Sequence, residues 1–196
     1  MPSTWPPSPN SANLTATVDR GLIDTNPARR ARPPKRAQRS AAPQIWTAAQ
    51  LAVFLDAAKT KRLYPALHLT AHTGLRRGEL AGLNWSDLNP TAATISIART
   101  RQASSDGIVE AHVKTRTSRR SIDLDANTGR VLRRWRRRLE QEGADITGAT
   151  PMFLNRAHTP PSPESFTQLF CRTVAASELP RIRFHDLRHT HASLLV

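Results

Sequence analysis

The chain has 196 residues, of which 38% are hydrophobic, and its 29 Lys and Arg residues outnumber its 15 Asp and Glu residues. This length fits one domain with an appendage, and the low hydrophobic content indicates one modest core. The formal charge of +14 and the isoelectric point near 11.6 favour a polyanionic partner, of which nucleic acid is the leading candidate. The alternative is that the arginines only solvate the surface.

Several classes of protein are excluded by simple counts. The single cysteine, Cys171, forms no internal disulfide and supplies no multi-cysteine metal site. No apolar run approaches the ~18 residues that span a bilayer, and residues 1–7 lack the basic and apolar parts of a secretion signal. We therefore expect a soluble cytoplasmic protein that has no membrane association and no cofactor.

The N-terminal part differs in composition from the rest of the chain. Residues 1–13 are rich in Pro, Ser and Asn, which predicts disorder. Apolar residues at helical spacing follow between Leu14 and Leu22, and then comes a basic, proline-containing linker at residues 28–36. We interpret residues 14–42 as the tail of one domain and its linker, and residues 43–196 as a second domain.

The first part of this second domain is predicted to be helical. Thr47 and Gln50 have the spacing of a capping box, and apolar residues at helical spacing follow at Leu51, Phe54 and Leu55. A second helix is predicted from Leu63 to about Thr70. Gly74 then permits a turn before a short helix that carries Glu79, Leu80 and Leu83.

The pattern then changes to the alternation that is typical of strands. Three short antiparallel strands are predicted at residues 94–97, 108–113 and 121–124, with a turn at Asp106-Gly107. The polar residues 115–119 are predicted to form the tip of a hairpin between the second and third strands.

Three helices are predicted to follow, at residues 128–142, 165–176 and 185–196. The first of them has an apolar face of Val131, Leu132, Trp135 and Leu139. Its other face is strongly cationic and consists of Arg130, Arg133, Arg134, Arg136, Arg137 and Arg138. The sequence thus predicts an α+β fold that is mainly helical and has a small three-stranded antiparallel sheet.

Three short segments stand out for their combination of basic and polar residues. They are residues 72–80, which read HTGLRRGEL, residues 114–120, which read KTRTSRR, and residues 185–192, which read HDLRHTHA. In this order they resemble the first signature box, the hairpin lysine segment and the second box of the tyrosine recombinase (phage integrase) family. The resemblance implies a catalytic domain at residues 43–196, and residues 14–42 resemble the last helix and linker of the family's core-binding domain.

Phosphodiester chemistry explains why such residues would be gathered. Negative charge builds on the non-bridging oxygens during attack, and two guanidiniums hold those oxygens well, so Arg76 and Arg188 are the candidates for this clamp. By resemblance, Lys114 is the general acid for the leaving oxygen. His185 is a candidate for hydrogen bonding to the phosphate or for proton transfer, and Glu79 is predicted to orient Arg76.

Each residue also has a simpler interpretation. An arginine and a glutamate on one helix often form only a surface ion pair. In the same way, the simpler role for Lys114 is that of an ordinary basic residue in a hairpin. His185, His189 and His191 have a spacing that metal ligands use, but no acidic or cysteine partner accompanies His189 and His191. We therefore expect no metal site, and a packing or polar role for these two histidines.

The resemblance also implies what the chain lacks. In this family a further phosphate ligand and then the nucleophilic tyrosine follow the second box, whereas this chain ends eight residues after Arg188 and its only tyrosine, Tyr64, lies before the first box. An aromatic packing role is expected for Tyr64, so no nucleophile is identified. We therefore expect a catalytic domain that is incomplete at its C-terminus.

Three hypotheses follow from these observations. The chain is a prophage or mobile-element integrase fragment that is related to DNA integration but does not cleave DNA alone. Alternatively, it is a basic DNA-binding remnant that occupies a site or modulates a full-length recombinase. The third hypothesis is that the chain scarcely folds. Double-stranded DNA is the expected partner in the first two, together with a full-length recombinase or further copies of the chain on DNA.

Overall fold

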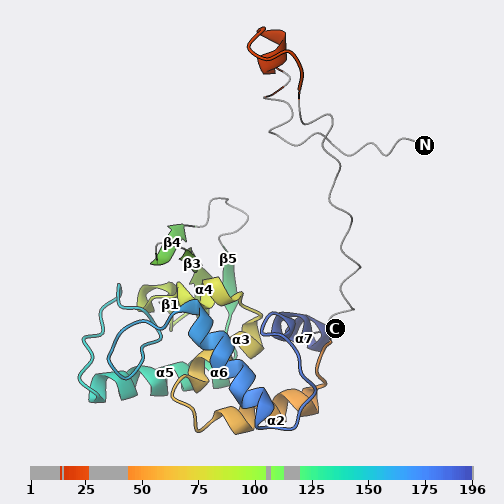
Figure 1. Cartoon of the computed structure of the whole chain (residues 1–196). Coiled ribbons are helices and arrows are strands. Elements are labelled where there is room, and N and C mark those ends of the chain that lie inside the picture. Colours follow the sequence, from red (N-terminus) through yellow and green to blue (C-terminus); the bar gives the residue numbers. More distant parts are fainter. Residues whose placement is uncertain (1–13, 15, 27–43, 105–106, 113–119, 196) are drawn as a thin grey trace. The chain divides into compact units, whose positions relative to one another are not determined.

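The computed structural model describes residues 14, 16–26, 44–104, 107–112 and 120–195, and divides the chain into two units, Met1–Ala42 and Pro43–Val196 (Figure 1). In the first unit, residues 16–19 are helical and Leu22 is 71% exposed. The predicted disorder of residues 1–13 and the basic linker at residues 28–36 lie outside the described residues. No helix in the described ranges has the length and apolar character needed to cross a membrane.

The second unit begins with two helices that form as predicted. Helix α2 (Ala48–Ala58) starts at the capping box of Thr47 and Gln50 and buries Leu51 and Phe54. Helix α3 (Tyr64–Thr73) is buried along most of its length and ends where Gly74 adopts a left-handed conformation, with φ of 61°. Because a residue with a side chain is strained at this φ, glycine is the residue that ends α3 and starts the turn most easily.

Four further α-helices lie in the described residues of this unit. They are α4 (Arg77–Ala81), α5 (Ala126–Gln141), α6 (Pro163–Ala175) and α7 (Asp186–Leu194). As predicted, α5 buries Leu132, Trp135 and Leu139. Asp125 caps α5, because its carboxylate accepts hydrogen bonds from two backbone N–H groups at the start of the helix.

The strands form two small antiparallel sheets. One has the order β1 (Leu88–Asn89), β2 (Thr94–Ile97) and β5 (Arg120–Asp123), and the other pairs β3 (Arg99–Ser104) with β4 (Gly107–His112). In the first sheet Ile95 lies opposite Ile122.

The α+β class and the three-stranded sheet are therefore confirmed, but the predicted strand pairing is wrong. The strand at residues 108–113 was expected to pair with the strand at residues 121–124, whereas β4 pairs with β3, a strand that was not predicted. The sequence of β3, RTRQAS, has no apolar alternation, because neither of its faces is fully buried. Only residues 105 and 106 separate β3 from β4 in the sequence, and so short a connection favours the pairing of consecutive strands.

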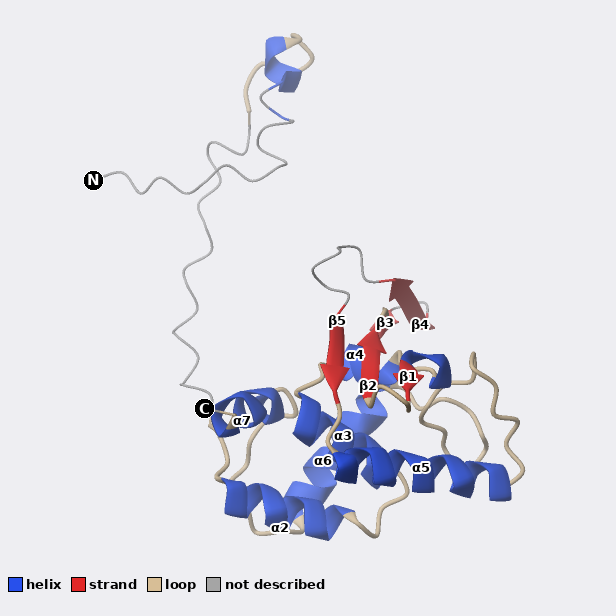
Figure 2. Cartoon of the chain, turned by 180° about the vertical axis from the view of Figure 1, so that it is seen from behind, coloured by secondary structure: helices blue, strands red, loops and turns tan. Residues whose placement is uncertain are grey.

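The core holds α7 next to α3. Trp46, Phe54 and Phe170 form an aromatic cluster with ring centroids 5.1–5.8 Å apart. The backbone N–H of Trp46 donates to the hydroxyl of Thr190 on α7 at 3.1 Å. Figure 2 shows α3 running through the middle of the domain, among α2, α5, α6 and α7. The packing thus brings the second predicted box, residues 185–192, against the end of α3. This helix leads into the first predicted box, residues 72–80.

Candidate functional site

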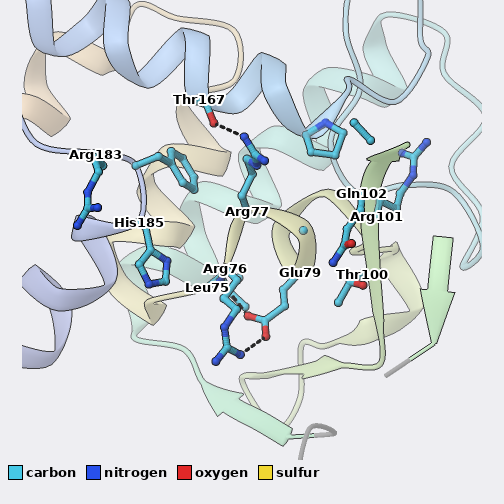
Figure 3. A pocket seen from close by; sticks show the side chains of 14 residues that line it. Leu75, Arg76, Arg77, Glu79, Thr100, Arg101, Gln102, Thr167, Arg183 and His185 are labelled. Atoms are coloured by element: carbon cyan, nitrogen blue, oxygen red, sulfur yellow. Dashed lines mark hydrogen bonds and ion pairs between the residues drawn. The ribbon is translucent and has the colours of Figure 1, made fainter. Parts of the chain in front are cut away.

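A pocket of about 540 Å³ lies where α4, β3, the start of α6 and the segment before α7 meet (Figure 3). Its lining includes four arginines and a histidine, namely Arg76, Arg77, Arg101, Arg183 and His185. Such a lining favours an anionic ligand, because guanidinium groups stay protonated at any physiological pH.

Arg76 immediately precedes α4, and Glu79 holds it in place. The backbone N–H of Arg76 donates to Oε2 of Glu79 at 2.8 Å, and its Nη1 donates to Oε1 at 3.0 Å. The side chain of Glu79 is 5% exposed, whereas that of Arg76 is 58% exposed. The buried carboxylate therefore fixes one edge of a guanidinium that remains open to the pocket.

A second arginine, Arg120 at the start of β5, shares the same carboxylate. Its Nη1 and Nη2 donate to Oε1 and Oε2 of Glu79 at 2.9 and 2.8 Å. Burial alone would raise the pKa of Glu79, but the hydrogen bonds from Arg120 and Arg76 outweigh burial and lower this pKa to about 2. The sequence analysis missed Arg120. The available signal was that Glu79, if buried, needs a cationic partner from elsewhere in the chain.

Arg188, on α7, does not line the pocket but contacts the turn that leads into Arg76. Its Nη1 donates to the carbonyl oxygen of Gly74 at 2.7 Å, two residues before Arg76. A Cβ atom on Gly74 would lie 2.9 Å from Cδ2 of His191, so α7 packs directly on this turn. The two boxes that were identified in the sequence are thus in contact, with Arg188 against the turn that leads into Arg76.

His185 precedes α7 and lines the pocket with Arg76. Its ring packs edge-on against that of His189, with centroids 5.3 Å apart. Partial desolvation lowers the pKa of His185, and electrostatic interactions with His189, Arg188 and Arg76 lower it further, while the carboxylate of Asp186 opposes them. The neutral imidazole, which has one donor and one acceptor nitrogen, therefore predominates at neutral pH.

Arg77 connects two of the elements that line the pocket. Its Nη1 donates to a carboxylate oxygen of Glu164 at 2.5 Å and to the hydroxyl of Thr167 at 3.2 Å, both on α6. Figure 3 shows Arg77 pointing toward Thr167, away from the Arg76–Glu79 pair. The two adjacent arginines therefore have different partners.

The sequence analysis also singled out Lys114, Tyr64 and a possible group of metal ligands. Lys114 lies outside the described residues, which stop at position 112 and resume at position 120. Tyr64, in the first turn of α3, is hydrogen-bonded through its hydroxyl to Nδ1 of His68 at 3.1 Å and does not line the pocket. Among the residues that the structure describes, no three His, Cys, Asp or Glu side chains form a group suited to a metal ion.

This geometry defines a domain that gathers arginines and a histidine from distant segments around one pocket. The chain belongs to the phage integrase family, whose sequence profile matches residues 44–196. The family that the three motifs indicate is therefore confirmed.

Individual relatives agree with this assignment. The chain is 29% identical over 128 residues to the ICEBs1 integrase of Bacillus subtilis (strain 168), a match that covers 63% of this chain and 34% of that protein. Its fold resembles the Tn1549 transposon integrase in complex with transposon right end DNA, with a TM-score of 0.72, 21% identity, and coverage of 94% of this chain and 63% of that one.

A more distant likeness is to a lambda integrase tetramer bound to a Holliday junction. Its TM-score is 0.55 at 22% identity, over 94% of this chain and 51% of that one. At these identities the two solved structures show a shared fold. The chain spans about a third of the ICEBs1 integrase and less than two thirds of the two solved chains.

Proposed function

We propose that this chain acts in DNA integration or site-specific recombination by binding duplex DNA, with Arg76 and Arg188 holding the phosphate at which the strand is exchanged. The contact between Arg188 and the turn before Arg76 carries the proposal, because it brings the arginines of two distant boxes to one place. Family membership and the DNA complex of the Tn1549 integrase support the choice of ligand.

The geometry of the two arginines suits this role. Within the described residues, the guanidinium of Arg76 bonds only to Glu79 and that of Arg188 only to Gly74, each through a single nitrogen. Each guanidinium therefore keeps further N–H donors for a phosphate. Donors that folding has already oriented stabilise the charge that develops on the non-bridging oxygens, at little reorganisation cost during the reaction.

The remaining roles extend this proposal. His185, neutral at neutral pH, is suited to a hydrogen bond with the phosphate or to moving a proton at the reacting oxygen. Lys114, in the segment between β4 and β5, is the proposed general acid. Glu79 orients Arg76 and does not itself react.

A covalent step also needs a nucleophile, and Tyr64 does not supply one at this pocket. We therefore propose that these 196 residues alone bind DNA without cleaving it. The lambda integrase tetramer on a Holliday junction supports assembly with further recombinase subunits on DNA. The alternative hypothesis, a DNA-binding remnant that occupies a site or modulates a full-length recombinase, requires the same DNA-binding step.

Binding of a duplex by single-residue variants tests the proposal. At about 150 mM salt, R76Q and R188Q should each lower the affinity roughly tenfold or more, because each removes charged hydrogen bonds to phosphate. The exposed Lys61 offers a control of equal charge, and K61Q should bind like the wild type. Equal affinities for R76Q and K61Q would contradict the role of the pocket, and a covalent protein–DNA adduct would contradict the absence of cleavage.

A further inference from the structure

Helix α5 has an outer face of arginines that lies opposite its buried face. Leu132, Trp135 and Leu139 are buried in the core, whereas Arg130, Arg134 and Arg137 are exposed. These three arginines have the spacing i, i+4, i+7, so they form one line about 10 Å long on the side of the helix away from the core. We call this line the α5 arginine row.

The acidic residues at the end of α5 are engaged by other arginines. Glu140 pairs with Arg136 at 3.0 Å, and Glu142 pairs with Arg138 at 2.8 Å. In the part of the chain that the structure describes, the α5 arginine row has no ion pair or hydrogen bond with another side chain. Three guanidiniums with all their side-chain donors available therefore face solvent side by side.

This arrangement is unfavourable for the helix alone. Like charges at i, i+4, such as Arg130 and Arg134, destabilise a helix. A polyanion that lies along the row removes this repulsion and accepts hydrogen bonds from all three guanidiniums. The row is therefore better suited to a complex than to free solvent.

The chemistry of the face distinguishes a nucleic acid from an acidic protein. None of the exposed large hydrophobic side chains among the described residues lies on α5. Protein interfaces usually have an apolar, aromatic-rich centre, whereas interfaces with DNA are polar and strongly positive. The α5 arginine row has the second character.

The row is also separate from the pocket. No residue of α5 lines the pocket, and α5 runs along the lower part of the domain in both Figure 1 and Figure 2, while α4 and the strand pair β3–β4 lie at the top. We propose that the α5 arginine row binds the phosphate backbone of a second DNA segment while the pocket holds the first. The inference rests on the proposed function, because it takes DNA as the ligand of the pocket.

Two-duplex capture tests this inference. The protein is bound to an immobilised duplex, washed, and offered a fluorescent duplex in solution. The wild type should capture the second duplex. R134Q/R137Q should still bind one duplex but lose most of this capture. For the second duplex, the slope of log K against log salt concentration should be weaker than that of the wild type by about two. The control K59Q/K61Q removes two exposed charges outside α5 and should capture like the wild type.

The outcomes separate this inference from the proposed function. Equal capture by R134Q/R137Q and the wild type overturns the inference, and so does wild-type protein that binds one duplex but captures no second. Competition by polyglutamate as effective as that by unlabelled DNA of equal charge overturns the assignment to DNA. If no duplex binds at all, the proposed function fails as well. Thermal transitions of the variants that lie no lower than that of the wild type establish that lost capture does not reflect unfolding.

Discussion

Two groups of arginines in the same domain differ in how the fold holds them. Arg76 and Arg120 share the buried carboxylate of Glu79, whereas Arg130, Arg134 and Arg137 on α5 face solvent without an acidic partner in the described residues. Each arginine in either group adds one unit to the formal charge of the chain. Net charge therefore indicates the class of partner, while burial of an acidic partner decides which arginines have a fixed position.

The difference has consequences for binding. The side chains of Arg76 and Arg120 lose rotamer freedom when the protein folds, so a ligand meets donors that are already oriented. Exposed arginines keep about 2 kcal/mol of side-chain entropy each, part of which is lost only on binding. The first group suits a site with defined geometry, and the second suits sequence-independent contact with a phosphate backbone.

The largest effect is expected from the acid that holds the first group. E79Q should lower the free energy of unfolding by about 3 kcal/mol, because it removes a buried partner of two arginines and turns an amide donor toward guanidinium donors. Urea unfolding measures this loss. The control is E164Q, which breaks the exposed pair between Glu164 and Arg77 and should cost at most about 1 kcal/mol. Similar losses in the two variants would show that Glu79 is no better held than a surface acid.

The same carboxylate should make stability depend on acid pH. Glu79 has a pKa of about 2 in the folded protein and an ordinary value of 4.5, so its contribution is complete above pH 4.5 and is lost as the pH falls toward 2. The difference in unfolding free energy between the wild type and E79Q should therefore shrink by about 3 kcal/mol across this range. A difference that stays constant from pH 5 to pH 2 would mean that Glu79 titrates alike in both states.

The turn that anchors Arg188 should give a smaller effect. G74A introduces a side chain at a left-handed φ, which costs about 1 kcal/mol, and a Cβ atom 2.9 Å from His191. We expect a total loss of about 2 kcal/mol in the free energy of unfolding. Gly143 is a matched control, because its φ is 82° and no atom lies within 4 Å of its Cβ position. If G143A costs as much as G74A, the packing of α7 on this turn contributes nothing.

Much of this organisation was predictable from the sequence. The buried faces of α2 and α5 follow from apolar residues at helical spacing, and the spacing of Arg76 and Glu79 indicated that they are neighbours. Arg120 was not predictable in this way. It lies 41 positions from Glu79, and only the tertiary fold brings the two together. Strand β3 was missed because its polar residues carry no alternation, and the role of Lys114 stays a prediction.

The smallest expected effect concerns the second group and has the opposite sign. R134Q should raise the free energy of unfolding by about 0.5 kcal/mol at low salt, because Arg134 has Arg130 and Arg138 as neighbours at i−4 and i+4. The gain should vanish at about 1 M salt, where charges are screened within about 3 Å. R136Q is the control two positions away. It breaks the pair with Glu140 and the contact with the Trp85 ring, 5.5 Å from the guanidinium carbon, and should therefore destabilise the protein. A loss of stability in both variants would mean that the α5 arginines support the helix and do not repel one another.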